Sequence, residues 1–317
     1  MRRGGPPMLP VAPGGVPPFA RVERGSRGLR FAPLGVPDGA SDAPVPPLRA
    51  LAAAPAGASR AAVVAEGKLV LAFSPGVAFT IALPRMHVVH DRRPPGLDLI
   101  AGAPGANAGL LRGADGWRAV VLPSLGDVAA DLGPGPAAIR GDGRRVAAVE
   151  GGAIVERDVG ADAEAARHEG AADALCYASD GAMSVAAGSS VGAPGTSPGG
   201  ASPIVALAAA HAAPRLAALH ADATVSVWET GAAEPFASWP APISGARSIA
   251  LTADGALVAL GTPDAPEPVA CLADAATGAP VRLIEGARAI APSADPAEML
   301  VAGDWGCAWL IPPEENA

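Results

Sequence analysis

Short apolar runs separated by tight turns recur along most of the chain, and they constrain its fold more than any other feature. Ser248–Leu251 leads into the turn 252–255 and then into a second apolar run. The same order of run, turn and run recurs around Asp142, Asp180 and Asp295. Asp-Gly-type turns between apolar runs are typical of β-hairpins, so each unit predicts one hairpin.

The hairpins are spaced regularly, and their turns fall near Gly57, Gly105, Asp142, Asp180, Ala213, Asp254 and Asp295. A period of roughly 40 residues with four strands per unit predicts an all-β fold, a β-propeller of seven four-stranded blades. Six blades remain an alternative, because the step from Asp180 to Ala213 has room for only a stunted blade. Helical repeats are disfavoured, because 40 glycines and 35 prolines interrupt the chain and leave 161–172 as the only weak helical pattern.

The third strands of two units carry a recognisable motif. His220 opens the run HADATVSVWETG, in which Trp228 and Glu229 stand side by side. A second run ends in Asp274 and the Thr-Gly pair at 277–278. These runs resemble the third strand and following turn of WD40-type repeats. The resemblance implies a propeller that serves as a platform for protein–protein interaction.

The composition divides the chain into three parts. They are a flexible, Pro- and Gly-rich arm over 1–18, the propeller over 19–311 and a C-terminal tail over 312–317. The last unit ends at 311 one strand short, whereas the strand-like run 28–34 is surplus at the other end. The sequence therefore predicts that an N-terminal strand, 28–34, pairs with 307–311 and closes the ring. The runs 51–55 and 61–64 are predicted to form the first hairpin.

Charge and cysteine usage limit the partners and the compartment. The net charge is −8 and the isoelectric point is about 5.1, so we expect no nucleic-acid partner. No apolar run is long enough to cross a bilayer, and the N-terminus lacks the apolar segment of a signal peptide. Cys176, Cys271 and Cys307 are odd in number and far apart. They predict reduced, partly buried thiols in a cytoplasmic protein. The assembly to which it belongs is expected to be of bacterial type.

Several residues have the chemistry of catalytic or metal-binding groups. The G-x-S-x-G matches at 188–192 and 195–199 lie in a loop without the helix that a nucleophile elbow needs. His87, His90 and Asp91 resemble a metal cluster, but ring nitrogens three residues apart on a strand face opposite sides. The aspartates in the hairpin turns are expected to stabilise those turns. No catalytic residue, metal ligand or cofactor is predicted.

The sequence thus favours a noncatalytic interaction scaffold, a subunit of a larger cytoplasmic assembly with other proteins as partners. Its predicted contact surface is formed by the turns between second and third strands, including 150–152 and 263–268. The candidate partner-binding residues are His220, Asp222, Asp304 and Trp305. For Trp305, packing back over its own hairpin is an equal alternative to exposure. The alternative function is a propeller hydrolase or lyase with a metal in the central channel.

Overall fold

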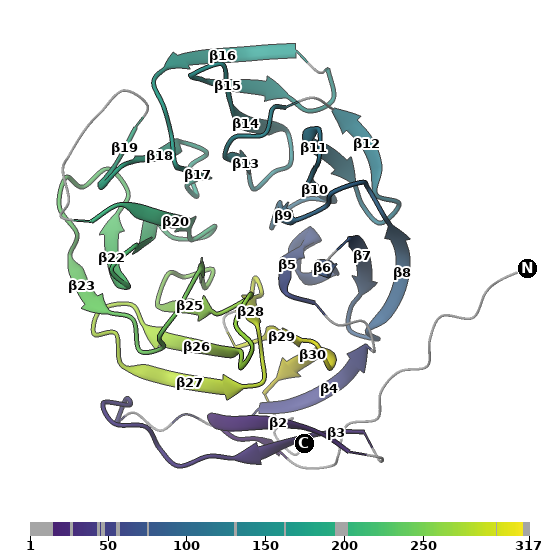
Figure 1. Cartoon of the computed structure of the whole chain (residues 1–317), viewed down its shortest axis with the longest axis vertical. Helices are drawn as coiled ribbons and strands as arrows, with labels where there is room; N and C mark the ends of the chain where they lie inside the picture. Colours follow the sequence, from purple (N-terminus) through teal and green to yellow (C-terminus); the bar gives the residue numbers. More distant parts are fainter. Residues whose placement is uncertain are drawn as a thin grey trace, which may run out of the picture.

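Seven small antiparallel sheets stand around a central channel, like the blades of a propeller (Figure 1). The structure is a computed structural model, and it describes residues 15–25, 28–42, 45, 48–54, 58–74, 76–129, 132–161, 163–193, 202–295 and 297–312. Within these ranges the regular structure is β-strand apart from one short 3-10 turn, η1 (Ala65–Gly67). Seven blades are present, and the predicted β-propeller is confirmed.

The first four blades run in chain order, and in each the first strand is the innermost. Blade one has β5 (Arg60–Val64), β6 (Leu69–Ser74), β7 (Val77–Ala82) and β8 (His87–Arg92). Blade two has β9 (Leu99–Gly102), β10 (Ala108–Gly113), β11 (Gly116–Val121) and β12 (Gly126–Ala129). Blade three has β13 (Ala137–Ile139), β14 (Arg145–Glu150), β15 (Ala153–Asp158) and β16 (Ala163–Glu169). Blade four, in the described residues, has β17 (Ala174–Tyr177), β18 (Met183–Ala187) and β19 (Ser190–Gly192).

The remaining three blades include strands from both ends of the chain. Blade five has β20 (Ile204–Ala209), β21 (Arg215–His220), β22 (Thr224–Glu229) and β23 (Ala237–Pro240). Blade six has β24 (Ser248–Leu251), β25 (Leu257–Gly261), β26 (Val269–Asp274) and β27 (Pro280–Glu285). Blade seven has β28 (Ala289–Pro292), β29 (Met299–Gly303), β30 (Gly306–Ile311) and β4 (Leu48–Ala54). Outside blades six and seven lie β1 (Gly15–Val16), β2 (Phe19–Gly25) and β3 (Gly28–Pro33).

The core is divided among the contacts between blades. In the described residues, buried apolar side chains form seven clusters, one between each pair of neighbouring blades. Many of these side chains are alanines; Ala217, Ala259 and Ala302 are each at most 2% exposed. Small side chains let the sheets approach closely, and this explains how a chain with so few aromatic residues fills its core.

The strand that completes the last blade is not the predicted one. β4 pairs antiparallel with β30, from Ala54 opposite Cys307 to Arg49 opposite Ile311. The fourth strand of a blade leads by a short connection into the first strand of the next blade, and β4 directly precedes β5 in the chain. The prediction that 28–34 fills this position is therefore wrong.

The same assignment corrects the first hairpin. The sequence predicts 51–55 as its first strand, but 51–54 belongs to β4, so blade one begins at β5. Its first turn contains Gly67, whereas the sequence spacing predicts a turn near Gly57.

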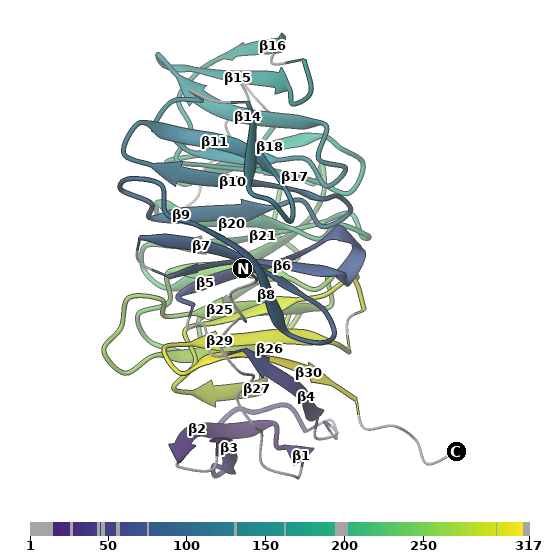
Figure 2. The ribbon, with the colours of Figure 1, turned by 90° about the vertical axis from the view of Figure 1, so that its right-hand side faces the viewer.

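The surplus run 28–34 has a different role. β3 pairs with β2, and β2 pairs in parallel with β27 of blade six, where Phe19 lies opposite Leu283. Figures 1 and 2 show β2 and β3 at the outer margin of the ring. Phe31 packs edge-on against Trp305 of blade seven, with ring centroids 6.1 Å apart. The hairpin β2–β3 therefore joins blades six and seven from outside.

The predicted helical pattern and the two predicted terminal segments can also be compared with the structure. Within the weak helical pattern 161–172, residues Ala163–Glu169 form a strand, β16, because this segment supplies the fourth strand of blade three. Gly15–Val16, at the end of the predicted arm, forms β1 and pairs with β4. Residues 1–14 and 313–317 lie outside the described residues. The described part of the chain holds no helix with the length and apolarity that a membrane crossing requires.

Candidate functional site

The ring has two faces, which we name by the turns that they carry. The first-turn face carries the turns between first and second strands and those between third and fourth strands. The second-turn face carries the turns between second and third strands and the connections between blades. The predicted contact residues belong to the second-turn face, whereas the series of turn aspartates belongs to the first-turn face.

The turn aspartates stabilise their own turns. In each, one carboxylate oxygen accepts the backbone N–H two residues further on, over 2.8–3.0 Å. These residues are Asp142, Asp180, Asp254 and Asp295. Gly143, Gly181 and Gly255 follow with positive φ, which glycine adopts without strain. The structural interpretation of this series is confirmed.

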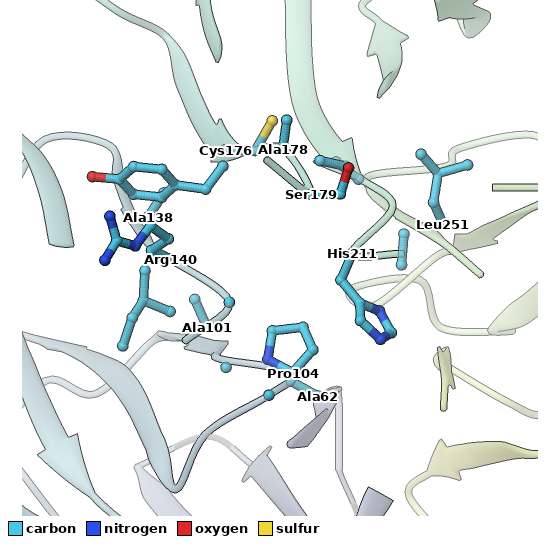
Figure 3. Close-up of a pocket in the computed structure, with 18 of the residues that line it drawn as sticks. Ala62, Ala101, Pro104, Ala138, Arg140, Cys176, Ala178, Ser179, His211 and Leu251 are labelled. Atoms are coloured by element: carbon cyan, nitrogen blue, oxygen red, sulfur yellow. The ribbon is translucent and has the colours of Figure 1, made fainter. Parts of the chain in front are cut away.

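A cavity of about 790 Å³ opens where the first strands of all seven blades reach the first-turn face. Alanine is the commonest residue in its walls, and this leaves the channel wide (Figure 3). The polar side chains in the lining are Arg140, Asp142, Tyr177, Ser179, Asp180, His211 and Ser293. Because each first strand pairs on one side only, its other edge turns backbone N–H and C=O groups toward the channel.

Two of the charged groups in the lining neutralise one another. The Arg140 guanidinium donates two hydrogen bonds to the Asp142 carboxylate, over 2.9 and 2.7 Å. These bonds hold the pKa of Asp142 below its usual range. Behind them, the Tyr177 hydroxyl donates to Glu156 over 3.0 Å, and burial raises the pKa of Tyr177. Tyr177 thus stays protonated and anchors the wall of the cavity.

His211 follows β20, and its ring projects into the cavity (Figure 3). Burial lowers its pKa from the ordinary value of 6.5, so the imidazole is neutral at pH 7. In the described residues no group forms a hydrogen bond to this ring. The sequence analysis did not single out His211 as a binding residue. The alanines around His211 carry no sequence motif. They come together only because the blades of the propeller are arranged in a circle.

The structure places the other suspected groups far from this cavity. His87, His90 and Asp91 are exposed on β8, the outermost strand of blade one. The described residues contain no group of three or more His, Cys, Asp or Glu side chains that could hold a metal ion. The match at 188–192 spans the turn between β18 and β19, and the one at 195–199 lies outside the described residues.

On the second-turn face, His220 and Asp222 form one predicted pair. His220 is buried, with its ring 2.9 Å from the Ser202 carbonyl oxygen and 3.1 Å from the Ser226 hydroxyl. Asp222 is exposed and accepts the Thr224 N–H over 2.9 Å. His220 therefore fixes the base of this turn, and Asp222 forms its tip.

Asp304 and Trp305 form the second predicted pair. Trp305 is 8% exposed; its indole packs back against Gly303 of its own hairpin and donates its N–H to the Gly286 carbonyl, in the connection from blade six to blade seven, over 2.8 Å. Asp304 is exposed and accepts two hydrogen bonds of 2.7 Å from Arg288. Arg288 also donates to the carbonyl oxygens of Pro263 and Ala265. One guanidinium thereby links the loops of blades six and seven.

The three cysteine thiols give a direct test of the packing between the blades. Cys176, which borders the cavity, Cys271 and Cys307 are buried, and burial raises the pKa of each from 9.0 to about 12. Since the thiolate is the reactive form, we expect labelling by a disulfide reagent at pH 8 to be at least about a thousandfold slower than in the unfolded chain. All three thiols should react in the guanidinium-unfolded chain. Fast labelling of one thiol in the native protein would contradict the packing around it.

No protein-family model matches the chain, and no curated protein matches it. The seven-bladed ring is consistent with a WD40-like repeat propeller, and the turn after β26 shows how one motif works. There Asp274 accepts the backbone N–H groups of Ala276 and Thr277 and the Thr277 hydroxyl, over 2.8–3.0 Å.

Proposed function

We propose that this propeller is a noncatalytic protein-interaction scaffold that binds its partner through the second-turn face. The observation that carries the proposal is the Arg288 network, which ties Asp304 to the loop 262–268. The Arg288 side chain is 15% exposed, and its bonds to the Pro263 and Ala265 carbonyls are partly buried, whereas the Asp304 carboxylate remains exposed. A surface whose loops are fixed before binding loses little conformational entropy when a partner docks.

The predicted contact residues then divide into two roles. Asp222 and Asp304 are exposed and face the partner, whereas His220 and Trp305 hold the turns in shape from below. Asp264 and Glu267, on the loop that Arg288 fixes, are also exposed. Neither forms an ion pair with another described residue, although the Asp264 carboxylate interacts electrostatically with Arg60 and Arg288. These carboxylates favour a partner that presents lysine or arginine side chains.

The proposed setting is a larger assembly in a reducing, cytoplasmic compartment. Three cysteines in the thiol form, each buried in a different part of the ring, suit such a compartment. The net charge of −8 supports the choice of a basic protein partner over a nucleic acid.

Charge reversal on the loop 262–268 tests this function. Partners are first identified by affinity purification of the full chain, and the purified partner is then titrated against variants. D264K/E267K is expected to weaken binding about tenfold or more, because two exposed carboxylates at the interface become repulsive. The effect should diminish as salt rises.

The matched control carries the same change of charge elsewhere. D38K/E234K alters one exposed residue beside the N-terminal hairpin and one on the first-turn face. It should bind the partner as the unmodified chain does. An equal loss in both double variants would reflect net charge alone and would refute the second-turn face as the contact surface.

A further inference from the structure

The cavity on the first-turn face has features that the fold does not need. The His211 ring points into open space and has no hydrogen-bond partner in the described residues. Asp180 uses one carboxylate oxygen for the Ala182 N–H and forms no ion pair with another described residue. A half-buried imidazole and an exposed carboxylate oxygen at the rim of the cavity are thus left for a ligand.

The charges of the lining select the kind of ligand. Arg140 and Asp142 form an ion pair and cancel, and the buried imidazole of His211 is neutral. Asp180 remains as a negative charge without a counter-charge among the described residues. Neutral imidazole and hydroxyl groups can donate or accept hydrogen bonds, and the first-strand edges present both N–H and C=O groups, so the charge of Asp180 decides the sign of the ligand. A cation with several N–H donors fits this set, whereas an anion would be repelled by Asp180.

The walls select the shape of the ligand. Ala62, Ala101, Ala138 and Leu251 supply apolar surface around the cavity (Figure 3). Lysine and arginine carry a cationic head on an apolar stem, and they bury the stem along apolar surface. We propose that the cavity binds a lysine or arginine side chain, with its head between Asp180 and His211 and its stem along the alanine wall.

An exposed aromatic side chain on the same face indicates that this cation belongs to a protein. Phe236, before β23 of blade five, is 45% exposed and stacks under the Arg215 guanidinium at 5.3 Å. It is the one aromatic side chain in the described residues that is exposed to this degree. The fourth strand of a blade lies about 14 Å from the first, a distance that four or five extended residues span. A segment with its basic residue in the cavity can therefore place an apolar residue on Phe236.

Labelled peptides test the cavity. Blocked pentapeptides with lysine, arginine, norleucine or glutamate at the centre of four glycines are titrated by fluorescence anisotropy. We expect saturable binding of the lysine or arginine peptide. The norleucine peptide, which keeps the stem and lacks the charge, should bind at least about tenfold more weakly, as should the glutamate peptide.

Two isosteric variants locate the site. D180N should weaken binding of the basic peptide about tenfold or more, because a charge-assisted hydrogen bond is lost while the amide oxygen can still hold the turn. D254N makes the same change in the equivalent turn of blade six, and Asp254 does not line the cavity. This variant should bind the basic peptide within about twofold of the affinity of the unmodified chain. Equal effects of the two variants would overturn the proposal.

The source of the cation and the link to the proposed function are tested separately. A longer peptide with leucine five residues from the lysine should bind more tightly, and F236A should remove that gain. Butylammonium carries the same stem and head as lysine and should bind about as the lysine pentapeptide does. A leucine peptide that binds no more tightly than butylammonium would assign the cavity to a small amine and overturn the protein source. D264K/E267K lies on the opposite face and should not alter peptide binding, so either proposal can fail without the other.

Discussion

Replacing Trp309 with alanine is expected to lower the free energy of unfolding by about 3–5 kcal/mol. The indole is 2% exposed and packs between blades seven and one, in the cluster that contains Phe79 and Met86. Its strand, β30, pairs with β29 on one side and with β4 on the other. The vacated space therefore adjoins the strand that joins the two ends of the chain.

Chemical denaturation followed by circular dichroism measures this loss. F236A serves as the control, because Phe236 is 45% exposed and lies outside the seven core clusters. It should change the free energy of unfolding by less than about 0.5–1 kcal/mol. A loss below about 1 kcal/mol for W309A would mean that this interface does not stabilise the ring.

The second large effect is expected for Gly116→Ala, which should cost about 3–5 kcal/mol. Gly116 has φ +111°, and a Cβ there would lie 2.6 Å from the Gly133 carbonyl oxygen. That oxygen accepts the Trp117 N–H over 3.0 Å. The substitution thus combines backbone strain, a clash with main-chain atoms and a damaged hydrogen bond.

Two other glycines separate these contributions. Gly152 has φ +87° and no atom within 4 Å of the position that a Cβ would take. G152A should therefore cost about 1–2 kcal/mol from strain alone. Gly141 has no positive φ and no atom within 4 Å of the position that a Cβ would take. G141A should therefore leave the free energy of unfolding unchanged or raise it slightly. Equal losses for G116A and G152A, measured by the same denaturation, would show that Gly133 moves aside at no cost.

The repeat is what the sequence predicts well. Asp142, Asp180, Asp254 and Asp295 all lie in turns between first and second strands, because an aspartate that bonds the N–H two residues on specifies that turn locally. Apolar runs on both sides of such a turn then form the hairpin. Local chemistry of this kind is visible in a linear pattern, so seven blades could be counted before any contact between blades was known.

Contacts between distant segments are what the sequence left undetermined. Leu29 and Phe31 make 28–34 the stronger strand by propensity, yet the alanine-rich β4 completes blade seven because it adjoins β5. For Trp305, only the position of the Gly286 carbonyl decides between exposure and burial. The cavity on the first-turn face was missed for the same reason. Alanines from strands of different blades form much of its wall, and alanine leaves no distinctive pattern.

The parallel pairing of β2 with β27 bears on how the protein is made. The ion pair between Arg21 and Glu285 joins residues 264 positions apart. At a synthesis rate of about 5–20 residues per second, the first strands to leave the ribosome wait roughly 15–50 s for their partners. During that interval β4 and the hairpin β2–β3 have neither β30 nor β27 to pair with. The nascent chain thus carries unsatisfied strand edges until its final blades emerge, and we expect chaperones that shield such edges during translation to bind it.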